Sequence, residues 1–292
     1  MTILKTDTVS GIGTEGTVFE GDITFDSLNY MTLPKGTTTQ SNRGRGLIIA
    51  GYTNPLNIKT TDYVQIQSLG NAIKFGDATA LVRGQDAAGS STRAVSAGGY
   101  VAPGIVDTIE YFTTATTGNA TDFGNLVSAT SSLAGFGNET RGIWAGGYVP
   151  SASDKIDYVT IASTGNAVSF GDTLTGAKRE HNAGSTPTRG IWAGGQPGSG
   201  ITNLIDYITI ASTGKVTDFG DLSIVMGSTA TATNSTRMLL GGGLVPGAID
   251  DIQSLTMTTL GNSVNFGNLT SCLLYTSPSP RDRQKCRMPS SA

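Results

Sequence analysis

The fold is decided by two neighbouring segments, RGIWAGG at residues 189–195 and IDYITIASTGKVTDFGD at residues 205–221. In the second segment Tyr207 and Ile208 belong to an alternating run in which successive side chains point to opposite faces of a β-strand. Apolar residues occur on both faces, which predicts a strand covered on both sides. The small residues around Gly214 then predict a hairpin turn into a second strand.

The same pair of segments recurs along the chain with a fixed period. Each copy opens with an arginine, and these arginines are 48 residues apart: Arg45, Arg93, Arg141, Arg189 and Arg237. Each copy also ends in a Phe that stands 12 residues after a Tyr, or after Ser254 in the fifth copy: Phe75, Phe123, Phe170, Phe219 and Phe266. Copy length varies only outside this 12-residue core, so the core is predicted to be a hairpin and the flanks to contain loops.

Each copy has room for four short strands, the usual content of one β-propeller blade. A segment that differs in every copy follows the glycine pair, for example YVAPGIVDTI at 100–109 and YVPSASDKI at 148–156. One blade buries too few large side chains to offset its chain entropy, so neighbouring blades must stack. We therefore predict an all-β propeller of five visible 48-residue, four-stranded repeats with a short N-terminal β segment. A parallel β-solenoid is the rival fold, which the long period and the hairpin turn disfavour.

Over residues 35–270 the repeats resemble those of kelch-like propellers. In both, a glycine pair ends an apolar strand. A strand with an aromatic residue follows, and then a strand that ends in a large aromatic side chain, which is Phe in this chain. The pairs in this chain are Gly98-Gly99, Gly146-Gly147, Gly194-Gly195 and Gly242-Gly243. The chain departs from the kelch pattern where Phe replaces the Trp that occurs late in a kelch blade.

The repeats also resemble those of tail-fibre and other virion proteins of marine bacteriophages. The phrase IDYITIASTG at 205–214 carries this likeness, together with FEGDITFDSLNYMTLPKGTTTQ at 19–40. The resemblance implies an N-terminal β segment at residues 1–34 for attachment or oligomerisation, followed by kelch-like repeats at residues 35–271.

The last residues, CLLYTSPSPRDRQKCRMPSSA at 272–292, break the repeat. They resemble the translation of the transposase adapter used in tagmentation sequencing libraries. We therefore expect residues 272–292 to be non-native and the repeat region to be truncated.

Composition narrows the classes of function. Gly makes up 40 of 292 residues, and charged residues make up 14%, against an average of about 25%. The C-terminal stretch 272–292 holds four of the 19 basic residues and both cysteines. The rest of the chain is therefore more acidic than the net charge of −3 indicates. This acidity predicts no nucleic-acid partner. Neither a secretion signal nor a long apolar run is visible, so no membrane insertion is expected.

Polar residues that recur in every copy form the most regular pattern. An acidic residue follows each of the first four arginines 16 or 17 positions later, and Gln253 takes its place in the fifth copy: Asp62, Glu110, Asp157 and Asp206. We interpret the arginines and acids as an ion-pair or hydrogen-bond network inside or between blades. The alternative is a ring of arginines that binds an anion in the central channel. Trp144 and Trp192 are expected to pack between blades rather than to stack on sugars.

Candidate contact residues lie next to the variable segments. A tyrosine directly follows the glycine pair or its equivalent in the first three copies, and we select these with two neighbouring residues: Tyr52, Tyr100, Tyr148, Pro150 and Gln196. His181 has no second His or Cys with which to build a metal site, and calcium at the FGD turns is disfavoured. No GxSxG-type motif occurs. We therefore predict no catalytic, metal-binding or cofactor-binding residues.

Our leading hypothesis is a non-enzymatic virion protein of a bacteriophage tail fibre, which binds a host cell-surface glycan or protein through its variable loops. Other virion tail proteins would be further partners, and homo-oligomer formation stays open. One alternative is a cellular kelch-like scaffold for protein interactions. A third hypothesis is a tail-spike depolymerase that acts on polysaccharide.

Overall fold

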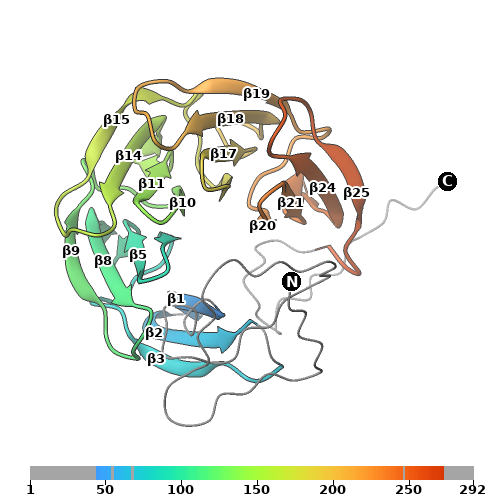
Figure 1. Cartoon of the computed structure of the whole chain (residues 1–292). Helices are drawn as coiled ribbons and strands as arrows, with labels where there is room; N and C mark the ends of the chain where they lie inside the picture. The colour runs from blue at the N-terminus through green and yellow to red at the C-terminus, as the bar shows by residue number, and fades with distance from the viewer. Residues whose placement is uncertain (1–43, 54–55, 67–68, 246, 273–292) are drawn as a thin grey trace, which may run out of the picture. The chain divides into compact units, whose positions relative to one another are not determined.

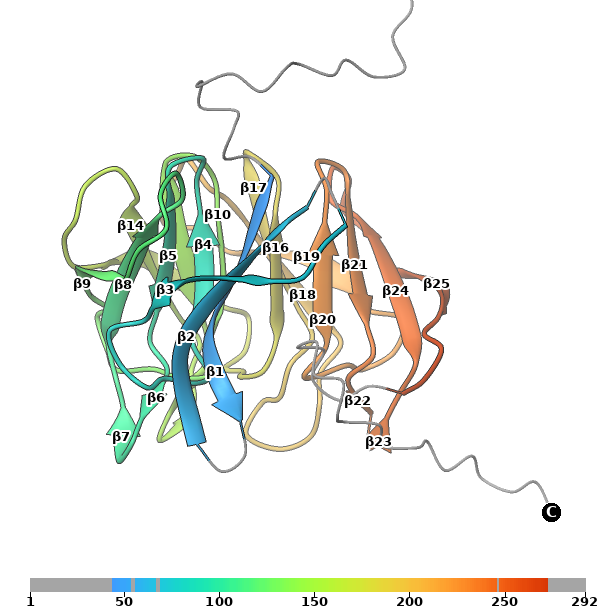
Figure 2. The ribbon, with the colours of Figure 1, turned by 90° about the horizontal axis from the view of Figure 1, so that it is seen from below.

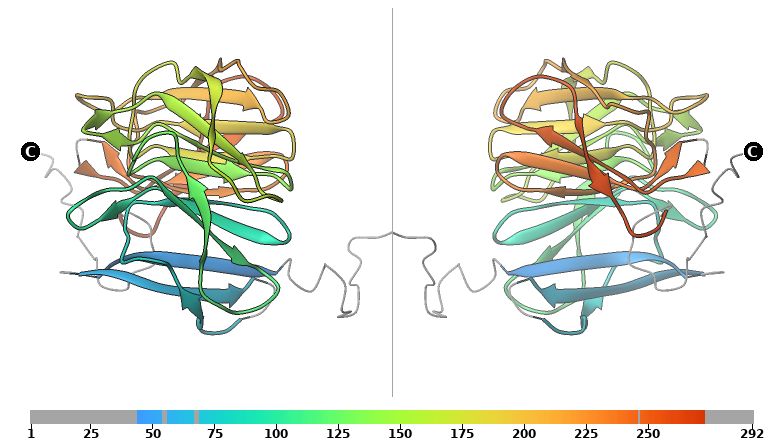
Figure 3. Two further views of the ribbon diagram at one scale, coloured as in Figure 1. Left: turned by 90° about the vertical axis from the view of Figure 1, so that its left-hand side faces the viewer. Right: turned by 90° about the vertical axis from the view of Figure 1, so that its right-hand side faces the viewer.

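The computed structural model describes residues 44–53, 56–66, 69–245 and 247–272. Within them the regular elements are all β-strands. Five antiparallel sheets of three or four strands are arranged around an axis as propeller blades (Figure 1), and three further sheets are two-stranded hairpins. Seen from the side, the blades stack face to face (Figure 3). The predicted all-β propeller with five visible repeats is therefore confirmed.

Each of blades 2 to 5 has four strands, which lie side by side in order from the axis to the rim (Figure 1). Blade 2 contains β4 (Asp86–Gly89), β5 (Arg93–Ala97), β8 (Thr108–Thr113) and β9 (Thr121–Asn125). Blade 3 contains β10 (Ala134–Gly137), β11 (Arg141–Ala145), β14 (Lys155–Thr160) and β15 (Val168–Thr173). Blade 4 contains β16 (Asn182–Ser185), β17 (Arg189–Ala193), β18 (Leu204–Thr209) and β19 (Thr217–Asp221). Blade 5 contains β20 (Ala230–Thr233), β21 (Arg237–Gly241), β24 (Asp251–Thr256) and β25 (Val264–Asn268).

Blade 1 shows three strands: β1 (Arg45–Thr53), β2 (Leu56–Gln65) and β3 (Ile73–Asp77). The positions 48 residues before β4 lie outside the described residues, so a fourth strand in this blade is not tested. The predicted segment at 1–34 also lies outside them, as do residues 273–292 of the tail.

Short hairpins join the second and third strands in three blades. They are β6–β7 (Tyr100–Val101 and Gly104–Ile105), β12–β13 (Tyr148–Val149 and Ser151–Ala152) and β22–β23 (Leu244–Val245 and Gly247–Ala248). Figure 2 shows β6–β7 and β22–β23 at the same end of the blades. These hairpins are the segments whose sequence differs between copies.

The glycine pair lets the chain turn into these hairpins next to another backbone. Gly98 and Gly99 have φ of 67° and 107°, a region that favours glycine. The Gly99 amide donates to the carbonyl of Thr130, in the connection to the next blade, at 2.8 Å. A Cβ on Gly98 would overlap that same carbonyl oxygen. The recurring glycines therefore hold the connection between blades close to the second strand.

Adjacent blades are joined by one repeated set of contacts. In blade 3 the guanidinium of Arg141 lies 4.8 Å above the ring of Tyr158, whose edge packs on Phe170. Nη1 of Arg141 donates to the carbonyl of Ile210 in blade 4 at 2.6 Å. The Arg, Tyr and Phe of each of the first four repeats thus form a single stack that reaches the next blade.

Large apolar side chains fill the space between blades, and the two tryptophans are among them, as predicted. Trp144 and Trp192 are buried, and each indole nitrogen donates to a carbonyl of the preceding blade's first strand, on Asp86 and Ala134 respectively. Buried tryptophan is stable when its N–H finds such a partner. The hydrophobic core is therefore distributed over the successive joints between blades.

Candidate functional site

One end of the blades gathers the variable hairpins and the connections from blade to blade, and we call it the loop face (Figure 2). Each connection pairs with the next blade's variable segment through an isolated antiparallel bridge, for example Arg83 with Tyr100 and Arg179 with Gln196. The Tyr100 amide donates to the Arg83 carbonyl at 2.7 Å. Side chains from different repeats are therefore held side by side on a rigid backbone.

Three candidate tyrosines stack with arginines on the loop face. The guanidinium of Arg83 lies 4.9 Å from the ring centres of both Tyr52 and Tyr100, so it sits between two blades' tyrosines. Arg179 lies 5.3 Å from the ring of Tyr148. Tyr52 and Arg83 are exposed, and the other side chains are half-buried. The stacked rings keep each guanidinium in place.

The other two candidates differ in their surroundings. Pro150 is exposed in the turn of the β12–β13 hairpin. The side-chain amide of Gln196 donates to Oε2 of Glu180 at 3.0 Å, and the hydroxyl of Ser228 donates to the same oxygen at 2.6 Å. Gln196 therefore belongs to a polar cluster that joins the variable segment of blade 4 to the connections on either side of that blade.

A chain of backbone hydrogen bonds lies beneath these side chains and joins four repeats. The Ser132 amide donates to the Gly84 carbonyl at 2.7 Å, Glu180 to Ser132 at 3.1 Å, and Ser228 to Glu180 at 2.8 Å. These residues are 48 apart, and all four have φ between 52° and 67°. A non-glycine residue in this region is strained and is held by its surroundings. The ladder therefore fixes the spacing of the loop-face side chains.

Sequence reasoning missed Arg83, Arg179, Glu180 and the ladder. The signal that points to them is the 48-residue spacing of the connections. The residue types at these positions differ from copy to copy, so they do not stand out as a motif.

The repeat arginines and acids lie at the joints between blades, but they do not pair with one another. Ion pairs among the described residues are Lys59–Asp77, Lys74–Asp77 and Lys178–Asp206, so none involves a repeat arginine. The arginines of blades 1 to 4 donate to backbone carbonyls of the next blade. Glu110 instead accepts from the amide and hydroxyl of Thr79 in the preceding connection, at 2.8 and 2.7 Å. The network thus runs between blades and uses the backbone.

The residue at the acidic position of the repeat, and the group that it binds, differ from one joint to the next. Asp157 accepts from the Val127 amide at 3.0 Å, and its burial raises its pKa against this bond and the charge of Lys155. Gln253 accepts from the hydroxyl of Ser223 at 2.5 Å. Asp62 lies half-buried in β2. Asp157 and Gln253 hold the connections in place through these bonds and therefore support the loop face from below.

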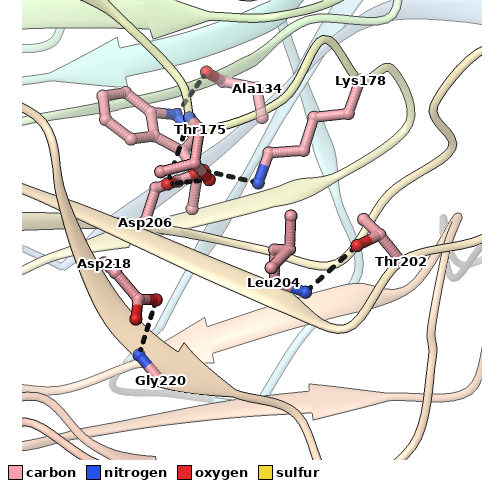
Figure 4. Close-up of polar contacts among 9 residues, drawn as sticks. Ala134, Thr175, Lys178, Thr202, Leu204, Asp206, Asp218 and Gly220 are labelled. Atoms are coloured by element: carbon pink, nitrogen blue, oxygen red, sulfur yellow. Dashed lines mark hydrogen bonds and ion pairs between the residues drawn. The ribbon is translucent and has the colours of Figure 1, made fainter.

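The joint between blades 3 and 4 contains a buried ion pair (Figure 4). Nζ of Lys178 lies 2.7 Å from Oδ2 of Asp206, and both side chains are at most 1% exposed. Oδ1 of Asp206 accepts from the hydroxyl of Thr175 at 2.6 Å, so both carboxylate oxygens are satisfied. Burial, aided by the charge of Lys178, holds the pKa of His181 well below its usual value, so this imidazole is neutral at pH 7.

The geometry of the loop face suits binding through hydrogen bonds and ring faces. Arginine donors, tyrosine rings and a side-chain amide are the groups with which proteins hold hydroxylated or anionic ligands. Two small cavities lie between blades, of about 10 and 30 Å³, lined by residues such as Asp157 and Glu110. Their volumes are those of one or two water molecules. Within the described residues, no helix is long and apolar enough to cross a membrane.

Comparison with known proteins gives no family to which the chain could be assigned. No protein-family model matches it, and a search of curated proteins found no match either. The function must therefore be argued from the loop face itself.

Proposed function

We propose that this chain is a non-enzymatic binding protein of a bacteriophage tail fibre, located in the virion, which recognises a host cell-surface glycan or protein through its loop face. The observation that supports this most is the placement of Arg83 between Tyr52 and Tyr100 on a constant blade frame. Loops that vary on a rigid scaffold are where binding sites concentrate. The likeness of the repeats to tail-fibre sequences supplies the virion context.

Within this proposal each group on the loop face has a separate task. Arg83 donates hydrogen bonds to carboxylate or hydroxyl groups of the ligand. The rings of Tyr100 and Tyr148 pack on the apolar faces of the ligand. Gln196 adds an amide that discriminates among hydroxyl positions. Individual contacts of this kind are weak, and several copies in one virion would strengthen attachment through avidity. Other tail proteins then hold the copies in place.

The test is binding of the purified, fluorescently labelled protein to a panel of marine bacterial strains. We expect saturable binding to some strains, competition by their extracted surface polysaccharide or proteins, and labelling of virions by antibodies against the chain. Binding to no strain, or unlabelled virions, would contradict the proposal.

The same preparation separates the two alternatives. Release of reducing sugar from capsule would identify a depolymerase, because cleavage exposes new reducing ends and binding does not. Capture of intracellular proteins in the absence of cell-surface binding would instead favour a cellular scaffold.

A further inference from the structure

Successive blades dock through one repeated arginine bond. Nη1 of the arginine that opens each of blades 1 to 4 donates to a backbone carbonyl of the following blade at 2.6–2.8 Å: Arg45 to Thr114, Arg93 to Ile161, Arg141 to Ile210 and Arg189 to Met257. The side chains of these four acceptor residues are at most 8% exposed. Where a neighbouring blade is docked, this hydrogen bond is therefore present and the acceptor residue is buried.

The outer strand of each of blades 1 to 4 is also covered by its neighbour. Phe75, Phe123, Phe170 and Phe219 are at most 3% exposed. The amide of Gly118 in the blade 2 turn donates to the carbonyl of Phe75 at 2.9 Å, and the blade 5 turn does the same to Phe219. The glycine after Phe75 lies so close to this turn that a Cβ would overlap the carbonyl of Gly118. The Phe-Gly pair is therefore the receiving half of the joint.

The outer face of blade 5 carries this receiving half without a neighbour among the described residues. Phe266 is 51% exposed, and a Cβ on Gly267 would meet no atom within 4 Å. Arg237 is exposed, and within the described part of the chain its guanidinium donates to no carbonyl. Ser254 stands where the other blades have Tyr, which also exposes these side chains. The open environment of Gly267 is independent of that replacement.

Blade 1 carries the complementary half, which no described residue of blade 5 covers. Ile66 occupies the position of the carbonyl acceptors Thr114, Ile161, Ile210 and Met257, yet it is 68% exposed. Val64, two residues earlier, is half-buried, although its equivalents in blades 2 to 5 are fully buried. Blades 1 and 5 lie at the two ends of the arc in Figure 1. No hydrogen bond joins their described residues.

We infer that the outer face of blade 5 is a docking surface for one further 48-residue repeat of the same type. Such a repeat carries both halves of the joint. Its third strand and turn cover Phe266 and accept from Arg237, while its own Phe-Gly strand receives the blade 1 turn and buries Ile66. A single inserted blade therefore satisfies both open faces at once.

A second copy of the chain fits less well. The ladder of backbone hydrogen bonds from Gly84 to Ser228 joins adjacent blades, so every docked blade is arranged around the same axis. Two copies would place ten blades around one axis, whereas propellers close with about four to eight. The repeat itself, rather than a five-blade partner, is the occupant that the geometry accommodates.

The test compares the chain as it stands with a chain in which a copy of residues 127–174 is inserted after Leu269. Thermal unfolding is measured with and without Phe266→Ala. We expect this substitution to lower Tm by about 5 °C or more in the longer chain and by about 2 °C or less in the present one. Phe219→Ala is the matched control and should cost the same in both chains.

Three results would overturn the inference. One is an equal effect of Phe266→Ala in the two chains, and another is failure of the longer chain to fold when the present one folds. The third is a dimer of the present chain that Phe266→Ala dissociates, which would make a second copy the occupant.

Cysteine labelling gives a second and independent measurement. With Ile66→Cys, maleimide should react rapidly in the present chain and slowly in the longer one. Peptide mapping measures the label at position 66 separately from any label at Cys272 or Cys286. The buried control Ile161→Cys should react slowly in both. Slow labelling of Ile66→Cys in the present chain would show that blade 1 closes directly on blade 5 and would also overturn the inference.

Discussion

At the residue scale, backbone conformation explains why glycine recurs after each second strand. Gly98 has φ of 67°, and blade 1 has Ala50 at the equivalent position with φ of 50°. Alanine in this region is strained by roughly 1 kcal/mol relative to glycine. Ala50 is therefore an exception that blade 1 tolerates at a cost.

Exchange of these two residues should have opposite effects. Ala50→Gly should raise the free energy of unfolding by about 1 kcal/mol. Gly98→Ala should lower it by at least about 1 kcal/mol, since its Cβ would overlap the carbonyl of Thr130. Urea unfolding of both variants measures the difference. Destabilisation by Ala50→Gly would contradict the account.

The Lys178–Asp206 ion pair has an uncharged counterpart at the next joint, where the equivalent residues are Met226 and Gln253. Removal of one buried charge leaves the other unpaired, so Lys178→Met alone should cost about 3–5 kcal/mol. The double variant Lys178→Met, Asp206→Gln should lie within about 1 kcal/mol of the parent chain. Equal instability of the single and double variants, measured by chemical denaturation, would refute this explanation.

Asp86 makes stability depend on pH. Burial raises its pKa to about 6 from 3.8, although its carboxylate accepts from the amides of Gly135 and Ala87. A raised folded-state pKa means that its contribution is full below pH 3.8 and is lost as pH rises through about 6. The stability of the parent chain relative to Asp86→Asn should therefore fall between pH 4 and 7. A constant difference in unfolding free energy over that range would exclude the effect.

The sequence predicted the positions of the joint residues but not their partners. Arg141 and Asp157 recur with the period, which indicates a structural task in every blade. Their partners are backbone groups of neighbouring blades, up to 69 residues away for Arg141. Every residue has such groups, so the sequence does not reveal which one is used. Lys178 occurs in only one copy, and periodicity therefore carried no information about it.

At the element scale, the 12-residue core was predictable as a hairpin because its length does not vary. The connections between blades were not predictable in the same way. Arg83 and Tyr100 belong to different repeats, and their bridge depends on how the blades stack. The sequence identified the tyrosines next to the variable segments, whereas the arginines that stack on them emerged only from the three-dimensional arrangement.

The variable hairpins should be exchangeable without loss of the fold. Replacement of residues 149–152 by residues 101–105 from blade 2 should change Tm by roughly 3 °C or less, because both hairpins close with the same backbone bond at their base. Ser153 donates to Gly147 in one blade and Val106 to Gly99 in the other. Calorimetry tests this expectation, and cooperative unfolding should be retained. Loss of folding would show that the hairpins belong to the frame.

At the scale of the whole molecule, stability depends on a series of similar joints between blades. Arg141 stacks on Tyr158 and donates to the Ile210 carbonyl, whereas Arg237 lacks both contacts among the described residues. Arg141→Ala should therefore lower the unfolding free energy by about 2 kcal/mol. Arg237→Ala should change it by less than about 0.5 kcal/mol. Equal effects in urea titrations would argue against the arginine bond as the element that joins the blades.

The most direct test of the central claim is binding to an array of bacterial surface polysaccharides and proteins. The array would compare the parent chain with Arg83→Ala on the loop face and with Lys215→Ala. Lys215 is an exposed cation in the β18–β19 turn, at the opposite end of the blade. We predict that Arg83→Ala weakens binding by about tenfold or more, and that Lys215→Ala leaves it unchanged. Equal binding by all three proteins would contradict the assignment of the loop face as the binding site.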